Sequence, residues 1–127
     1  MPASILLVED HPTMREAVRA ILEGDGHHVA EATDGLAALD RIRRERFDLV
    51  LLDLNLPGLS GYELLAAIRG EPGGAALPLV VVTATGDEGR AAALGAGADD
   101  YLTKPFSPAA LLETVARRLA APGAPGA

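Results

Sequence analysis

An apolar run that ends beside a carboxylate constrains this chain more than any other feature. Residues 49–54 read LVLLDL, five apolar residues out of six, which is typical of a strand buried on both faces of a parallel sheet. Asp53 stands near the end of that run, and buried carboxylates are costly unless they are paired or bind a cation. Asn55, Pro57 and Gly58 follow and end the strand. We therefore expect Asp53 at a carboxyl-terminal strand edge, where open α/β sheets bind their ligands.

Five apolar runs, including this one, alternate with helical patterns along the chain. We expect strands over residues 4–8, 28–32, 47–53, 79–83 and 98–103, and helices over residues 13–23 and 86–95 and in the intervals 33–46, 60–70 and 107–119. Connections this short force a parallel sheet, whose crossovers are right-handed. The expected fold class is therefore α/β, a doubly wound, five-stranded parallel sheet in a three-layer αβα arrangement.

The helical segments differ in how well apolar residues anchor them. The second is expected to bury Leu36, Leu39 and Ile42 along one side, after a cap at Thr33 or Asp34. The fourth, residues 86–95, is rich in glycine and alanine and has only Leu94 as a large apolar anchor. Because glycine weakens a helix, we expect the fourth helix to be short or mobile.

Length and composition narrow the class of protein. A chain of 127 residues suits one domain, expected over residues 1–120, with the Pro/Gly/Ala-rich residues 121–127 as a linker or tail. The net charge of -7 argues against direct nucleic-acid binding, which needs clustered Lys and Arg. The absence of cysteine excludes disulfides and thiolate metal sites. With no leader and no apolar stretch of membrane-spanning length, the expected location is the cytoplasm, without membrane contact.

Polar residues follow other apolar runs at the same end. Glu9 and Asp10 come after the first run. Thr83 ends the fourth run, and Lys104 follows the fifth. A sheet ordered 2-1-3-4-5, as in the flavodoxin-like arrangement, brings these ends together around one crevice. Lys104 is the only lysine among 11 basic residues, and its compact ammonium is not interchangeable with a guanidinium at a tight phosphate site.

The charges in this crevice predict a divalent cation. Three carboxylates and one ammonium sum to a charge of minus two. Each close carboxylate pair would repel by about 4 kcal/mol at ~4 Å and an effective dielectric constant near 20. Oxygen ligands without histidine or cysteine favour Mg²⁺ or Mn²⁺ over zinc.

Together these motifs resemble the receiver domains of two-component response regulators. The resemblance covers residues 4–120 and rests on one joint set of residues: Glu9-Asp10, Asp53 with Pro57-Gly58, Thr83-Ala84, Tyr101 and Lys104-Pro105-Phe106. It implies that Asp53 accepts a phosphoryl group from a phosphohistidine on a sensor histidine kinase or a phosphotransfer protein. It also implies the ligands of Mg²⁺, which would be Asp10 directly, Glu9 through water, Asp53, and the backbone carbonyl of Asn55.

The same resemblance implies roles around the phosphoryl group. Lys104 would pair with the phosphoryl oxygens and would precede a cis peptide bond to Pro105. The hydroxyl of Thr83 would turn onto the phosphoryl group, and the small Ala84 would leave room for it. Tyr101 would then move from an exposed to a buried rotamer, changing the face of the fourth helix, fifth strand and fifth helix that signals to an unknown effector or partner. Such a domain is not an enzyme beyond its own phosphorylation and autodephosphorylation.

Other functions compete with this interpretation. A metal-dependent phosphohydrolase of the aspartyl-phosphate type also uses a strand-end aspartate, but places an acid two residues later, where this chain has Asn55. A flavin-binding electron carrier needs a phosphate loop where Glu9 and Asp10 would repel phosphate. A pseudo-receiver that binds partners without phosphorylation is disfavoured by the complete residue set. A phosphorylation-dependent homodimer stays open, because the chain is one residue shorter than the family pattern near residues 86–90, which puts the register of the fourth helix in question.

Overall fold

Five parallel strands form the centre of the fold in the order β2-β1-β3-β4-β5, which confirms the expected fold class and strand order. The computed structural model describes residues 2–54, 56, 60–83 and 87–120. β3 begins at residue 49 and β5 at residue 100, each two residues later than expected. The elements in chain order are β1 (Ser4–Val8), α1 (Pro12–Gly24), β2 (His28–Ala32), α2 (Gly35–Arg44), β3 (Leu49–Asp53), α3 (Gly61–Arg69), β4 (Leu79–Thr83), α4 (Asp87–Gly95), β5 (Asp100–Thr103) and α5 (Pro108–Ala120).

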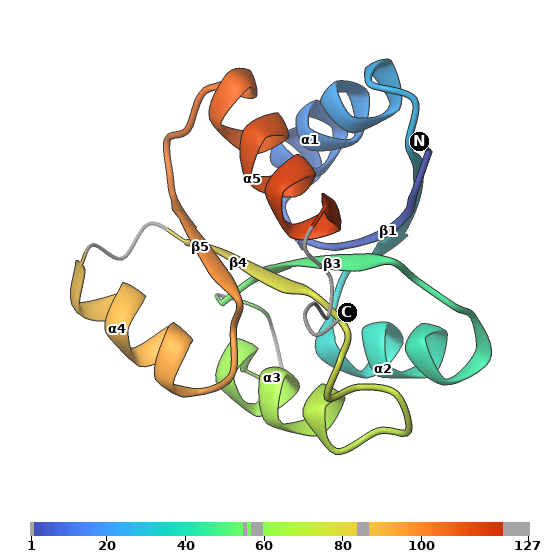
Figure 1. Cartoon of the computed structure of the whole chain (residues 1–127), viewed down its shortest axis with the longest axis vertical. Helices are drawn as coiled ribbons and strands as arrows, with labels where there is room; N and C mark the ends of the chain where they lie inside the picture. Colours follow the sequence, from blue (N-terminus) through green and yellow to red (C-terminus); the bar gives the residue numbers. More distant parts are fainter. Residues whose placement is uncertain (1, 55, 57–59, 84–86, 121–127) are drawn as a thin grey trace.

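Helices cover both faces of the sheet. α1 and α5 lie on one face, and α2, α3 and α4 lie on the other (Figure 1). Successive residues of a strand point to opposite faces, so Ile5 and Leu7 enter the core under α1 and α5, whereas Leu6 and Val8 enter the core under α2 and α3. Burial on both faces explains why the strands are continuous apolar runs rather than alternating ones.

Side-chain caps fix where three helices begin. The carboxylate of Asp34 accepts a hydrogen bond from the Ala37 N–H at 2.8 Å, so Asp34 is the cap of α2. Ser60 and Glu63 form a capping box at the start of α3. Ser107 Oγ accepts from the Ala110 N–H at 3.0 Å at the start of α5. The starts of these helices therefore follow from local sequence, because each cap satisfies an N–H that the helix leaves unpaired.

Two leucines that were expected to anchor their helices in the core are exposed instead. Leu36 in α2 is 71% exposed, whereas Leu39 is buried as expected, together with Ala38, and Ile42 is partly buried. Leu94 in α4 is 39% exposed, and the neighbouring Ala93 is the one that is fully buried. Helical periodicity identifies residues that share a side of a helix, but burial depends on which part of that side the rest of the fold covers. The small Ala93 lets α4 approach the sheet closely.

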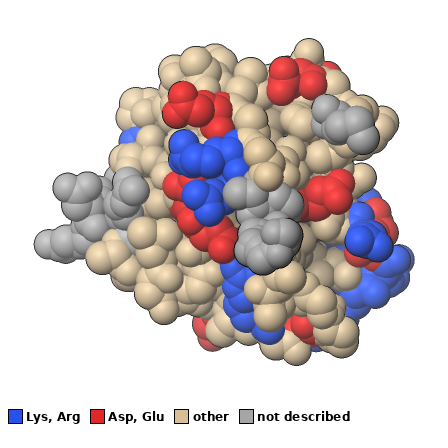
Figure 2. All heavy atoms as spheres, in the orientation of Figure 1, with Lys and Arg blue, Asp and Glu red and all other residues tan. Residues whose placement is uncertain are grey.

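The arginines at the end of α2 lie in solvent and pair with nearby acids. Arg41 pairs with Glu45, the residue that follows α2, and Arg43 crosses to Glu71 after α3 at 2.9 Å. On the face drawn in Figure 2, basic and acidic side chains also lie next to one another. Exposed pairs of this kind contribute at most about 1 kcal/mol each, so they leave stability to the core.

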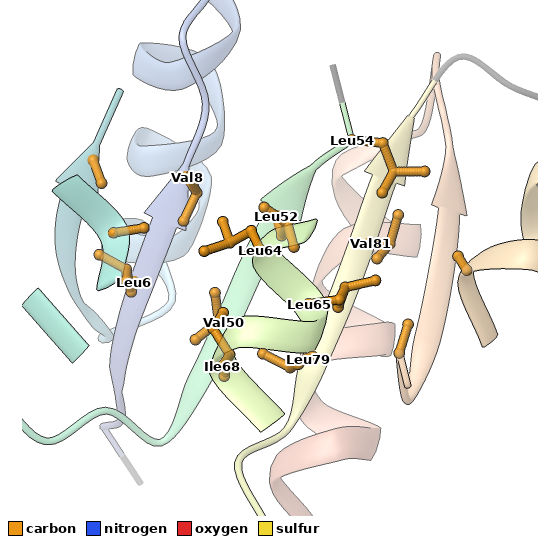
Figure 3. Close-up of a cluster of buried hydrophobic side chains, with 14 of the residues drawn as sticks. Leu6, Val8, Val50, Leu52, Leu54, Leu64, Leu65, Ile68, Leu79 and Val81 are labelled. Carbon is orange, nitrogen blue, oxygen red and sulfur yellow. The ribbon is translucent and has the colours of Figure 1, made fainter. Parts of the chain in front are cut away.

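The core between the sheet and α3 fixes the end of β3. Figure 3 shows Leu64, Leu65 and Ile68 of α3 packed over the residues of β3 and β4. The side chains of these three residues are fully buried. Burying such a side chain stabilises the fold by about 1.5–3 kcal/mol, so α3 holds rigidly the strand that carries Asp53.

Candidate functional site

Asp53 is the last residue of β3 and is only 4% exposed. The next residue, Leu54, is held against the start of α3, where the Gly61 N–H donates to the Leu54 carbonyl at 3.1 Å. A Cβ atom on Gly61 would lie 2.4 Å from Leu54 Cα, so only glycine permits this close approach of α3 to the strand end. The sequence predicted the position of Asp53 but missed Gly61, although glycine at the first position of a capped helix was a usable signal.

Lys104 lies between two buried carboxylates. Its Nζ atom is 2.7 Å from Asp53 Oδ2 and 3.2 Å from Glu9 Oε1. Glu9 follows β1 and is 3% exposed, and Lys104 follows β5. Asp53 and Glu9 are 51 and 95 positions from Lys104 in the sequence, yet all three side chains meet at one edge of the sheet, as the strand order predicted.

The electrostatics show a shortage of positive charge. Burial raises the pKa of the Glu9 carboxyl above its ordinary value, and hydrogen bonding and repulsion from Asp53 raise it further. Burial alone would lower the pKa of the Lys104 ammonium, but its hydrogen bond to Asp53 and the charges of both acids outweigh burial and raise it. Two buried carboxylates thus share one ammonium, and the charge they lack is that of a further cation.

Asp10 completes a set of acids that could hold a metal ion. Carboxylate oxygens of Glu9, Asp10 and Asp53 lie within 4.8 Å of one another. Asp10 is exposed, and a cavity of about 450 Å³ opens here, lined by Glu9, Asp10, His11, Thr13, Met14, Ala17, Asp53 and Lys104. Oxygen donors of this kind fit a hard divalent cation such as Mg²⁺, so the residues present suit the metal expected from the sequence.

Thr83 and Tyr101 lie on the neighbouring strands β4 and β5. Thr83 is fully buried at the end of β4, and its carbonyl accepts a hydrogen bond from the Lys104 N–H at 2.8 Å. Tyr101 is 5% exposed, which is the buried one of the two rotamers expected. The peptide bond between Lys104 and Pro105 is cis.

Two residues of the expected site lie outside the described part of the chain. They are Asn55, the expected carbonyl ligand, and Ala84, the expected small neighbour of the phosphoryl group. Pro57 and Gly58, which belong to the motif around Asp53, also lie outside the described residues. Their assignments stay predictions, as do the register of α4 near residues 86–90 and the tail at 121–127.

A larger cavity of about 520 Å³ lies at the opposite edge of the sheet, between the end of α2 and the segment after α3. Arg43 and Arg44 line it, but each pairs with an acid of this chain, Glu71 and Asp40 respectively. Among the described residues that line this cavity, no set of acids comparable to the one around Asp53 comes together. The smaller cavity is therefore the site at which chemistry is expected.

Comparison with known proteins assigns most of the chain to one family. The sequence pattern of the response regulator receiver domain matches residues 5–116. The chain is 42% identical over 121 residues to the probable transcriptional regulatory protein TcrX of Mycobacterium tuberculosis, covering 94% of this chain and 49% of TcrX. It is 44% identical over 118 residues to the response regulator protein FleR of Pseudomonas aeruginosa, covering 92% of this chain and 24% of FleR. The chain thus spans half or less of these relatives.

Solved structures agree with the sequence comparison. The receiver domain of a sensor histidine kinase from Pseudomonas aeruginosa, with magnesium coordinated in its active-site cleft, has a TM-score of 0.89 and 35% identity, covering 95% of this chain and 100% of that one. The chemotaxis response regulator CheY4 of Vibrio cholerae has a TM-score of 0.87 and 32% identity, covering 92% of this chain and 98% of that one. Both the fold and the sequence are therefore similar.

Among the helices of residues 2–54, 56, 60–83 and 87–120, none combines the length and apolar character needed to cross a bilayer. The cytoplasmic location and the absence of direct nucleic-acid binding stay predictions.

Proposed function

This chain belongs to the receiver domains of response regulators, and from that premise we propose that Asp53 is its phosphoryl acceptor. Phosphorylation on an aspartate with Mg²⁺ is the general function of this family, whose members are signalling modules. The observation that carries the assignment is the contact of Lys104 Nζ with Asp53 at 2.7 Å and Glu9 at 3.2 Å. A buried carboxylate beside an ammonium and two further acids has the groups that phosphoryl transfer needs.

The transfer uses the side chains already in place. A carboxylate oxygen of Asp53 forms the new O–P bond as the N–P bond of a phosphohistidine breaks, and the freed imidazole nitrogen takes up a proton. The ammonium of Lys104 then pairs with phosphoryl oxygens, because it already lies within hydrogen-bond distance of the attacking carboxylate. The buried walls around Asp53 keep these charge interactions strong.

The metal would be held by the acids at the ends of β1 and β3. Asp10 would bind it directly, Glu9 through water, and Asp53 and the Asn55 carbonyl would complete the protein ligands. Bound Mg²⁺, or Mn²⁺, neutralises negative charge that develops on the phosphoryl oxygens. The exposure of Asp10 supports a direct role, because an exposed carboxylate can turn toward an arriving ion without breaking a buried contact.

The phosphoryl donor would be a sensor histidine kinase or a phosphotransfer protein, and the output would pass to a further domain or partner. One relative, 41% identical over 120 residues, is the DNA-binding response regulator MtrA of Mycolicibacterium smegmatis, and this chain covers 51% of it. Any DNA binding would therefore belong to an effector domain outside the receiver domain. The chain itself would catalyse only its own phosphorylation and dephosphorylation.

The signal would leave through Thr83 and Tyr101. Drawing the Thr83 hydroxyl toward a phosphoryl group would vacate space behind it and favour the buried position of Tyr101. α4 is suited to respond, because its buried anchor is the small Ala93 rather than Leu94. Thr83→Ala should accept phosphate nearly normally but fail to shift the α4-β5-α5 face, measured by amide exchange with a beryllofluoride mimic. A response around α2 with residues 87–106 unchanged would contradict this route.

Mass spectrometry after incubation with a small acyl phosphate or phosphoramidate donor tests the acceptor. The parent should gain one phosphoryl group per chain, only with Mg²⁺ present, and Asp53→Asn should gain none. Asp100→Asn, which changes a buried aspartate at the other edge of the sheet, is the matched control and should react like the parent. An adduct of equal yield in Asp53→Asn would show that another residue is the acceptor.

A further inference from the structure

The two acids at the end of β1 lie on a loop that needs support from elsewhere. Glu9 and Asp10 follow the last residue of β1, and α1 begins at Pro12. The Glu9 N–H donates to the Ala32 carbonyl at 3.0 Å, and the His11 N–H donates to Glu9 Oε2 at 3.3 Å. These bonds use the amide hydrogens of Glu9 and His11. The carbonyl oxygens of both acids require separate donors.

One side chain supplies those donors. Arg15, in the first turns of α1, places its Nη1 atom 3.2 Å from the Glu9 carbonyl oxygen and 3.4 Å from the Asp10 carbonyl oxygen. Its side chain is 19% exposed, and its Nε atom lies 3.6 Å from Glu31 Oε1 on β2. Glu31 lies opposite Leu7 in the β1–β2 pairing. Arg15 thereby joins the loop, α1 and β2 through one planar group.

From this geometry we infer that Arg15 is a positioning residue, which holds the β1–α1 loop so that the carboxylates of Glu9 and Asp10 face Asp53. The inference rests on the proposed function, because it concerns the acids assigned to the metal. Groups that do not bind the metal themselves but hold its ligands in place commonly tune metal affinity. A guanidinium suits the task because its fork can reach two carbonyls and a carboxylate at once.

The charge of Arg15 and its geometry act in opposite directions. As a cation near the acids, Arg15 repels a divalent metal ion, so removing its charge alone would tighten metal binding. As a support of the loop, it favours the arrangement that binds the ion, so removing it would weaken binding. The sign of the change in affinity therefore separates the two roles.

Arg19 offers a matched control on the same helix. It lies one turn further along α1 and contacts Glu31 Oε2 at 3.4 Å and Glu23 Oε2 at 3.0 Å. The hydrogen bonds of Arg19 within the described chain go to carboxylates and not to the loop. Arg19→Gln removes the same charge as Arg15→Gln without removing a donor to the loop carbonyls.

Mg²⁺ titration by calorimetry compares the two variants with the parent. We expect Arg15→Gln to weaken Mg²⁺ binding on the order of 10-fold, and Arg19→Gln to leave it unchanged or slightly tighter. In the metal-free proteins, the amide chemical shifts of Asp10 and His11 should change in Arg15→Gln and not in Arg19→Gln. Unchanged or tighter binding in Arg15→Gln would overturn the inference.

Arg15→Lys covers the case in which Arg15→Gln folds poorly. It keeps the charge, but one ammonium nitrogen cannot replace both the Nη1 atom that contacts the two carbonyls and the Nε atom that contacts Glu31, so Mg²⁺ binding should weaken by several-fold. Parent-like binding in Arg15→Lys would show that charge alone matters and would overturn the inference. A parent that binds Mg²⁺ but takes no phosphoryl group on Asp53 would instead refute the proposed function, and the loop measurements would still stand.

Discussion

Two buried acid clusters lie at opposite edges of the same sheet and differ in the balance of their charges. At the carboxyl edge, Asp53 and Glu9 share the single ammonium of Lys104. At the amino edge, Asp100 begins β5 and meets two guanidinium groups, with Arg117 Nη2 at 2.7 Å and Arg118 Nε at 3.3 Å. In the first cluster two buried acids share one cation, whereas in the second one buried acid meets two cations, of which Arg117 also pairs with the exposed Glu113 at 3.7 Å.

This difference separates a structural cluster from a functional one. The Asp100 carboxylate also accepts a hydrogen bond from the Tyr101 N–H at 2.8 Å, so both of its oxygens have donors. Burial alone would raise the pKa of Asp100, but the hydrogen bonds from Arg117 and Tyr101 and the charges of both arginines outweigh burial and lower it. Glu9 shows the reverse, a raised pKa. The cluster that the chain leaves short of positive charge is the one suited to bind a cation.

The largest effect on this comparison is expected from Lys104→Met. The variant leaves two buried carboxylates without their cation, so without metal the free energy of unfolding should fall by about 3 kcal/mol. Mg²⁺ should restore more stability to this variant than to the parent, because the ion replaces the counter-charge that the variant has lost. Urea denaturation with and without Mg²⁺ measures both changes. Equal Mg²⁺ stabilisation of variant and parent would mean that Lys104 and the ion do not balance the same acids.

Asp100→Asn should have the next largest effect, and it should not depend on metal. The substitution removes the charge-assisted hydrogen bond from Arg117 and the ion pair with Arg118, so the free energy of unfolding at pH 7 should fall by about 2 kcal/mol. Denaturation curves with and without Mg²⁺ should show the same loss. A loss that Mg²⁺ reverses would remove the distinction between the two clusters.

Acid should abolish the difference between Asp100→Asn and the parent. The pKa of Asp100 is lowered in the folded protein, so its stabilising contribution is complete above the ordinary aspartate value of about 4 and is lost as pH falls through the lower folded value. The gap between the two denaturation curves should be constant from pH 7 to about pH 5 and should close below about pH 4. A gap that widens in acid would contradict the assigned direction.

The smallest effect is expected from Asp10→Asn, and its sign is opposite. The variant relieves repulsion with Glu9 and Asp53, so the metal-free protein should become more stable. Because Asp10 is exposed and solvent screens its charge, the gain should stay below about 1 kcal/mol. Thermal unfolding in a chelating buffer measures it, and calorimetry should show loss of Mg²⁺ binding. A metal-free variant less stable than the metal-free parent would refute the repulsion.

Much of the candidate site was predictable because its residues interrupt strong local patterns. Asp53 breaks an apolar strand, and Lys104 is the only lysine of the chain. The strand order then brought their side chains to one edge, as expected. Asp100 was not singled out, although it also stands in an apolar strand, because its partners Arg117 and Arg118 come from α5 and share no pattern with it.

The sequence by itself determined the fold class and the starts of the capped helices, because apolar periodicity and caps act between residues close in the chain. The strand order was expected from the arrangement that brings the polar strand ends around one crevice. The sequence also indicated which edge of the sheet would carry the chemistry. Only the tertiary structure decided that Ala93 rather than Leu94 anchors α4, that Gly61 fits against Leu54, and that Arg15 reaches back to the loop of acids. These depend on how closely elements approach one another, and close packing sets that distance through side chains far apart in sequence.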